Sequence, residues 1–211
     1  MLIDHIGWQF FPDIIWLRVV GRLAFPIFAF FIAQGMIYTR NRKRYILNML
    51  ILGVISQIPY MFLSARMYDL NIMFTFVVAS VAIVLIEEVG KKQNIGCSIL
   101  LGVLFVVTVV LSYFGILNYG FLGVMLVLCF YFIKNKGWSF AVAGVILVLM
   151  AIRTCLRSSF SFENAVQAWS VLSLVLLLFY NGGKGKANLK HMFYIFYPAH
   201  LVVILIITLL I

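Results

Sequence analysis

Long apolar runs separated by short polar connections constrain this chain more than any other feature. They lie at about residues 1–11, 17–38, 45–64, 71–89, 96–114, 119–133, 138–152, 164–180 and 191–211. Most are about 15–22 residues long, and a helix needs about 20 apolar residues to cross a bilayer. Strands of a membrane barrel would instead alternate apolar and polar side chains over about ten residues. The pattern therefore predicts an all-α, polytopic bundle of about nine transmembrane segments.

The composition also indicates an integral membrane protein. Of the 211 residues, 65% are hydrophobic and 10% are charged, whereas soluble domains carry about 25% charged residues. A net charge of +10 suggests a nucleic-acid partner at first sight, but basic residues of membrane proteins gather in cytoplasmic loops. Because every connection is short, we expect one integral membrane domain over residues 1–211, in contact with lipid and with no nucleic acid.

Two of the runs are short for a span. The run at 1–11 would rise only about 16 Å as a helix, which is half of a hydrocarbon core of about 30 Å. The first helix is therefore either a half-span or a truncated one, whose start lies upstream of Met1. The run at 138–152 is also short, and a re-entrant segment is an alternative to a full span.

Basic residues in the connections predict the orientation. One side of the alternating topology carries Arg40, Arg42, Lys43, Arg44, Lys91, Lys92, Lys134, Lys136, Lys184, Lys186 and Lys190, and the other carries Arg66, Arg153 and Arg157. The richer side is expected to be cytoplasmic. We therefore predict a multi-pass protein of the cell membrane, with the Arg40–Arg44 loop in the cytoplasm and the C-terminus outside.

Four ionisable residues fall where lipid-facing apolar side chains are expected. Arg18 and Arg22 are four residues apart, so they share one face of a helix. A charge at membrane depth costs about 3 kcal/mol on insertion scales, and Arg22 lies about 9 Å inside Trp16 at 1.5 Å per residue. Asp4 and His5 are expected at a similar depth. Such a convergence indicates a functional site by default.

A structural interpretation of these four residues stays open. Asp4 can form an ion pair with Arg18 or Arg22 that only fastens two helices together. Neighbouring residues of a helix point about 100° apart, so Asp4 and His5 cannot both face the same arginine. His5 is then either a packed core histidine or a catalytic residue. More polar side chains are expected at the same depth, namely Ser56, Gln57, Asn71, Thr75, Asn118 and Tyr119.

The last run carries aromatic and imidazole side chains at a spacing of three. His191, Tyr194, Tyr197 and His200 lie on one drifting helix face, and Pro198 interrupts the hydrogen-bond ladder beside them. They form either an aromatic belt with a core histidine or the lining of a polar cavity. The cysteines, Cys97, Cys129 and Cys155, show no metal-ligand spacing, so no metal site is expected. Glu87 and Glu88 are expected to be solvated boundary residues.

Four stretches of the sequence resemble the TraX family. They are Met1 to Gly7 (MLIDHIG), Arg18 to Phe28 (RVVGRLAFPIF), Thr39 to Tyr45 (TRNRKRY) and Ser56 to Pro59 (SQIP), and the closing Phe193 to Leu201 (FYIFYPAHL) looks like the family's C-terminal signature. The resemblance covers nearly the whole chain. It implies similarity to a pilin acetylase, and to the wider group of membrane acyltransferases that take an acyl group from acyl-CoA in the cytoplasm.

The resemblance also implies roles for particular residues. In the wider group a histidine of the first helix follows a basic residue by eleven positions; the matching histidine is His5, and the basic residue would fall upstream of Met1. His5 is then the general base of an acetyl transfer from acetyl-CoA. Arg22 and Arg18 are candidates to stabilise the oxyanion, and Asp4 to orient the system.

The donor and acceptor follow from the same resemblance. Arg40 and Arg44 are candidate contacts for the phosphates of acetyl-CoA, and Tyr194 and His200 are further candidate contacts for this donor. The acceptor is an amine or hydroxyl of the envelope, such as a pilin N-terminus or a glycan. Two alternatives stay open: a transporter or flippase for an anionic or sugar-lipid substrate, which Arg18 and Arg22 would bind, and a non-catalytic partner in pilus or envelope assembly.

Overall fold

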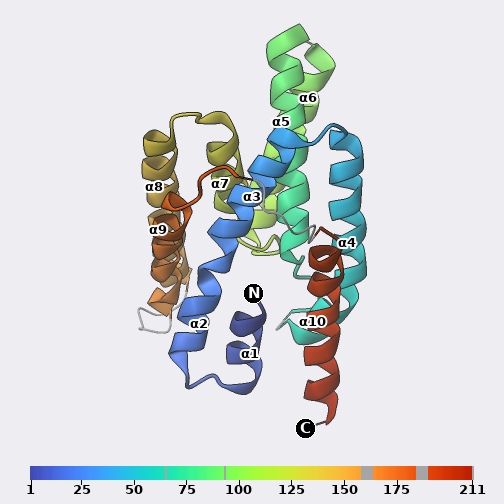
Figure 1. Cartoon of the computed structure of the whole chain (residues 1–211). Helices are drawn as coiled ribbons and strands as arrows, with labels where there is room; N and C mark the ends of the chain where they lie inside the picture. The colour runs from blue at the N-terminus through green and yellow to red at the C-terminus, as the bar shows by residue number, and fades with distance from the viewer. Residues whose placement is uncertain (65, 93, 158–163, 184–189, 211) are drawn as a thin grey trace. The chain divides into compact units, whose positions relative to one another are not determined.

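The predicted all-α architecture is confirmed by a computed structural model, which describes residues 1–64, 66–92, 94–157, 164–183 and 190–210. Within these residues the helices are α1 (Leu2–Phe10), α2 (Ile15–Arg22), α3 (Ala24–Tyr38), α4 (Arg42–Leu63), α5 (Ile72–Lys92), α6 (Ile95–Tyr113), α7 (Gly120–Phe132), α8 (Lys136–Arg157), the 3₁₀ helix η1 (Asn164–Val171), α9 (Leu172–Leu178) and α10 (Lys190–Leu210). Each predicted apolar run corresponds to one helix or to two nearly continuous ones (Figure 1).

The described residues form two compact units. The first comprises residues 1–28 and 135–211, and the second comprises residues 29–134. In the first unit α1 packs on α2 and α10, while η1 packs on α2, α8 and α9. In the second unit α5 is central, because it contacts α4, α6 and α7. The single domain expected from the sequence stays a prediction.

Pro26 explains why the second apolar run is two helices. The run is helical from Ile15 to Tyr38 except for a break at Leu23. Proline has no N–H to give to the carbonyl four residues earlier, and its ring crowds that carbonyl. Here that carbonyl belongs to Arg22, so the ladder is interrupted one residue after the arginine.

The run at 138–152 is longer in the structure than its apolar letters suggest. Helix α8 covers Lys136–Arg157, which is 22 residues, and at 1.5 Å per residue it rises about 33 Å. This length favours a full span over the re-entrant alternative. The first helix, by contrast, has nine residues.

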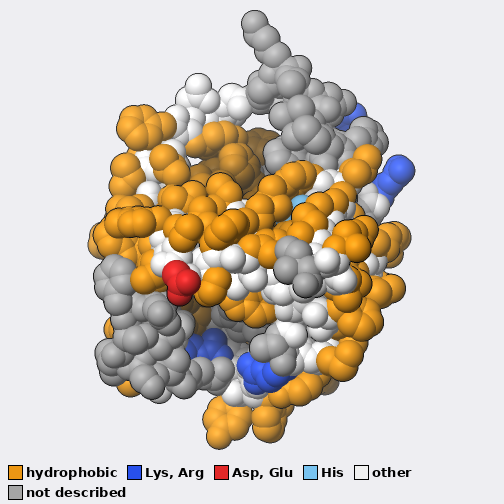
Figure 2. Space-filling model, turned by 90° about the horizontal axis from the view of Figure 1, so that it is seen from below, with side chains coloured by type: hydrophobic (Ala, Val, Ile, Leu, Met, Phe, Trp, Pro, Cys, Tyr) orange, Lys and Arg blue, Asp and Glu red, His pale blue; other side chains and the backbone are white. Residues whose placement is uncertain are grey.

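The surface is that of a multi-pass membrane protein. Among the described residues, five helical segments are long and apolar enough to cross a membrane: Ile15–Tyr38, Arg42–Leu63, Ile72–Lys91, Ile95–Tyr113 and Lys136–Leu156. Large apolar side chains cover much of the face drawn in Figure 2, with few charged ones among them. Helix α6 presents Ile99, Val103 and Val106, each more than half exposed. Such surface is stable against lipid and not against water.

Each unit buries its own apolar side chains. In the first unit Phe25, Leu147 and Leu201 are almost fully buried, and in the second Phe76 and Leu126 are. Phe30 of α3 meets Phe130 of α7 edge to face, with ring centroids 5.4 Å apart, an arrangement that aromatic pairs favour. Two rigid scaffolds result, and polar side chains are placed within each.

Candidate functional site

A close helical hairpin positions the N-terminal polar residues (Figure 1). Helices α1 and α2 approach so closely at Gly21 that a Cβ there would lie 2.6 Å from the Cα of Asp4. A Cβ on Gly7 would lie 2.7 Å from the Cβ of Leu17. Only glycine leaves room for this approach. The two glycines therefore hold Asp4 directly against the helix that carries the arginines.

Asp4 is shared by both arginines. Its Oδ1 lies 3.2 Å from Nε of Arg18 and 3.6 Å from Nε of Arg22. The three side chains are about one fifth to one quarter exposed, so water screens them only in part. Oδ1 lacks a hydrogen bond of good geometry among the described residues, so the attraction is mainly Coulombic. One carboxylate is thus shared by two guanidinium groups.

The His5 ring meets a second imidazole. Its ring centroid lies 5.7 Å from that of His200 on α10, at 44° between the ring planes. His200 is 5% exposed, and its Nδ1 lies 2.9 Å from the carbonyl oxygen of Phe196. The structure therefore brings together Asp4 with the two arginines, and His5 with His200, within one unit.

The other candidate donor contacts are placed differently. Arg40 and Arg44 are both exposed at the connection between α3 and α4, and Asn41 caps α4 by accepting from the backbone N–H of Arg44 at 2.9 Å. Tyr194 lies on α10, but its side chain is outside the described residues, as are Lys184 and Lys186 of the same predicted basic cluster. Roles in donor binding for these residues stay predictions.

The further polar residues that were expected at the depth of Asp4 and His5 bond largely to one another in the second unit. Asn71 is fully buried, and its Nδ2 donates to the carbonyl of Gly53 at 2.7 Å and to Oε1 of Gln57 at 2.9 Å. Nδ2 of Asn118 donates to the hydroxyl of Tyr60 at 3.1 Å, and the carbonyl of Asn118 accepts from Thr75. Their donors and acceptors are largely satisfied, which is what a structural network requires.

Two more members of that predicted group have distinct positions. Ser56 is fully buried, and its Oγ has no hydrogen-bond partner among the described residues. Tyr119 caps α7 in the left-handed region, with φ of 58°. Such a φ is uncommon for a residue with a side chain. Neither position carries a chemical role by itself.

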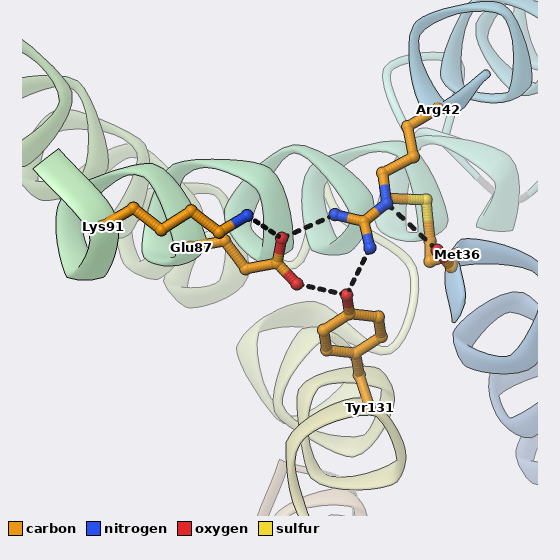
Figure 3. Close-up of polar contacts among 5 residues, drawn as sticks. All are labelled: Met36, Arg42, Glu87, Lys91 and Tyr131. Atoms are coloured by element: carbon orange, nitrogen blue, oxygen red, sulfur yellow. Dashed lines mark hydrogen bonds and ion pairs between the residues drawn. The ribbon is translucent and has the colours of Figure 1, made fainter. Parts of the chain in front are cut away.

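A charged cluster at the other ends of these helices was not predicted (Figure 3). Arg42 donates to the carbonyl of Met36 at 3.1 Å, to Oε2 of Glu87 at 2.6 Å and to the hydroxyl of Tyr131 at 2.7 Å. That hydroxyl donates to Glu87, which also accepts from Lys91 at 3.4 Å. The expectation of a merely solvated Glu87 is therefore wrong, because α4, α5 and α7 converge on it.

The described residues hold no group of three or more His, Cys, Asp or Glu side chains arranged to bind a metal ion. Cys129 is buried, and Cys97 and Cys155 are partly buried. The side chains brought together in the first unit are instead one carboxylate, two guanidinium groups and two imidazoles. Such side chains can transfer protons and stabilise negative charge.

The family model described as TraX protein matches residues 1–208. The chain belongs to the TraX family. This confirms the resemblance drawn from the N-terminal and C-terminal motifs. It places Asp4, His5, Arg18, Arg22 and His200 inside the part of the chain that the TraX model covers.

Two curated proteins are similar to this TraX chain, one over most of its length and the other over a shorter part. A probable fimbrial assembly protein, FimC of serogroup H1 from Dichelobacter nodosus, is 28% identical over 222 residues, which is 95% of this chain and 88% of the relative. An uncharacterized protein of Rickettsia prowazekii (strain Madrid E) is 36% identical over 75 residues, 36% of this chain and 28% of the relative. No solved structure matches.

Proposed function

We propose that this TraX protein is an integral membrane acetyltransferase, which moves an acetyl group from acetyl-CoA to an amine or hydroxyl of an envelope acceptor. The observation that carries the proposal is the arrangement in the first unit. His5 lies beside a second imidazole and one residue from Asp4, the carboxylate that holds two arginines. A base close to two guanidinium groups suits a reaction that removes a proton and develops an oxyanion.

The chemistry assigned to the chain is a balanced acyl transfer. The acceptor nitrogen or oxygen attacks the carbonyl carbon of the thioester while its proton passes to His5. The negative charge on the carbonyl oxygen is stabilised by Arg22 or Arg18. The carbon–sulfur bond then breaks, and the leaving thiolate takes the proton from His5. Acetylated acceptor and free coenzyme A result, and His5 is regenerated.

The orientation and the acceptor belong to the same proposal. The Arg40–Arg44 loop lies in the cytoplasm, where acetyl-CoA is made. The acceptor is a component of fimbrial or envelope assembly. The name of the Dichelobacter relative supports this class, as a pilin N-terminus supplies an amine and a glycan supplies hydroxyls.

Turnover by the purified protein tests the proposal. In detergent with acetyl-CoA and an acceptor peptide or glycan, the protein should release free thiol. His5→Ala should lower the rate by about 10²–10⁴-fold, the usual contribution of general base catalysis. Asp13→Asn, an exposed change in the α1–α2 connection, is the matched control and should leave the rate unchanged. Equal thiol release by His5→Ala and the wild type would contradict the assignment.

Transport of an anionic substrate is the second candidate, because two guanidinium groups share one carboxylate. The two guanidinium groups attract an anion, and Asp4 is a competing ligand that the anion displaces. Proteoliposomes distinguish the two functions. A transporter moves a labelled anionic sugar-lipid without releasing thiol from acetyl-CoA, whereas the proposed enzyme releases thiol and moves no lipid.

A further inference from the structure

His200 has one ring nitrogen without an assigned role. Its Nε2 is buried and has no hydrogen-bond partner among the described residues, although the ring of His5 is only 5.7 Å away between centroids. Buried polar atoms in native proteins nearly always have partners, so an exception calls for an explanation. A side chain kept for packing alone would be better served by leucine or phenylalanine.

The surroundings of His200 fix which nitrogen carries the hydrogen. Nδ1 lies 2.9 Å from the carbonyl oxygen of Phe196, and a carbonyl can only accept. Nδ1 must therefore donate, and in the neutral ring Nε2 is then an acceptor with a free lone pair. The Phe196 ring stacks on His200 at 14° and 5.3 Å, and Tyr197 meets it at 5.5 Å. Residues in the preceding turn of α10 therefore hold the His200 ring in place.

Asp4 faces the arginines with one carboxylate oxygen. Its Oδ1 lies within 3.6 Å of Arg18 and Arg22, and neighbouring residues of a helix point about 100° apart. A catalytic histidine is usually held in one tautomer by an acceptor at its second ring nitrogen. The free lone pair of His200 belongs to a ring whose centroid is 5.7 Å from that of His5, and it is a candidate for this acceptor.

We propose that His200 is a positioning residue for His5 rather than a contact for the acetyl donor. Nε2 of His200 accepts one ring N–H of His5, directly or through a single water, which leaves the other nitrogen of His5 free to act as the base. When His5 takes the acceptor proton, both of its nitrogens carry hydrogen and the bond to His200 holds the imidazolium. The proton stays on His5 until the thiolate leaves. This inference rests on the proposed acetyl transfer.

The kinetic test separates positioning from donor binding. His200→Ala should lower kcat by about 10²-fold, the scale of a misplaced catalytic group, with an unchanged KM for acetyl-CoA. Added imidazole should restore part of the rate, and His200→Gln, which keeps an accepting oxygen, should lose less. Thr208→Val, which removes a hydroxyl that donates to the Ile204 carbonyl on the same helix, is the matched control. A raised KM with kcat retained, or full activity, would overturn the proposal.

A spectroscopic test needs no turnover. Protein labelled with ¹⁵N-histidine in detergent micelles should show His200 protonated at Nδ1 and bare at Nε2, and the Nε2 resonance should move in His5→Gln. Protonation of His200 at Nε2 instead, or an Nε2 resonance that does not move in His5→Gln, would refute the pairing. Absence of wild-type thiol release with this signature intact would count against acetyl transfer itself, so the two failures are distinguishable.

Discussion

One carboxylate beside two arginines makes Asp4 the residue on which the local charge balance depends. The sequence left open which arginine it would meet, and the structure shows both within 3.6 Å of the same oxygen. A group that is about one fifth exposed is shielded from water enough for its loss to matter, since it would leave two like charges facing each other.

Replacing Asp4 should therefore destabilise the α1–α2 hairpin. Asp4→Asn is expected to lower the free energy of unfolding by about 2 kcal/mol, in the range for interactions with charged groups. Thermal unfolding in detergent, followed by tryptophan fluorescence, measures the change. The exposed Asp13→Asn should unfold at the wild-type temperature, and an equal loss in both variants would show that the ion pair contributes nothing specific.

At the scale of the elements, different contacts hold the helices together in the two units. In the first, glycines bring α1 and α2 together, and in the second, Arg42 joins α4 to α5, α7 and the carbonyl of Met36. A Gly21→Ala change tests the close approach of α1 and α2, and removal of the Tyr131 hydroxyl tests the contacts of Arg42.

Gly21→Ala should separate the hairpin. The added Cβ would lie 2.6 Å from the Cα of Asp4, and overpacking of this kind costs about 1–3 kcal/mol. Gly102 of α6 is the matched control, because nothing lies within 4 Å of a Cβ there. Gly102→Ala should be neutral or stabilising by up to about 1 kcal/mol. Thermal unfolding of both variants decides, and equal stability would place the close approach in doubt.

Tyr131→Phe should loosen the cluster of Figure 3. It removes a hydroxyl that accepts from Arg42 and donates to Glu87, at an expected cost of about 1 kcal/mol. Combined with Glu87→Gln in a double-mutant cycle, the two changes should be non-additive. Tyr38→Phe, at a side chain that is 73% exposed, controls for loss of a hydroxyl. Strict additivity would contradict a connected cluster.

At the scale of the whole molecule, the untested quantity is the direction in which the chain crosses the bilayer. The excess of basic residues on one side predicts a cytoplasmic Arg40–Arg44 loop. In a chain whose three cysteines are replaced by alanine, Arg40→Cys should react with an impermeant thiol reagent only after cell lysis. Asp13→Cys should react in intact cells. The reverse pattern would invert the topology and move the proposed site to the cytoplasmic leaflet.

The sequence alone determined the helical class, the number of apolar runs and the family, because each depends on local composition or on contiguous motifs. It also singled out Asp4, His5, Arg18 and Arg22, since ionisable groups are conspicuous inside apolar runs. It left open which arginine Asp4 would meet and it named no partner for His5, because such pairing depends on how helices rotate against each other. His200 meets His5 across 195 residues, and Glu87 meets Arg42 across 45. Only the packing of the folded chain decides such contacts. The sequence of a helix alone leaves open which face it buries, and the close approach at the glycines and the filled cores select that face.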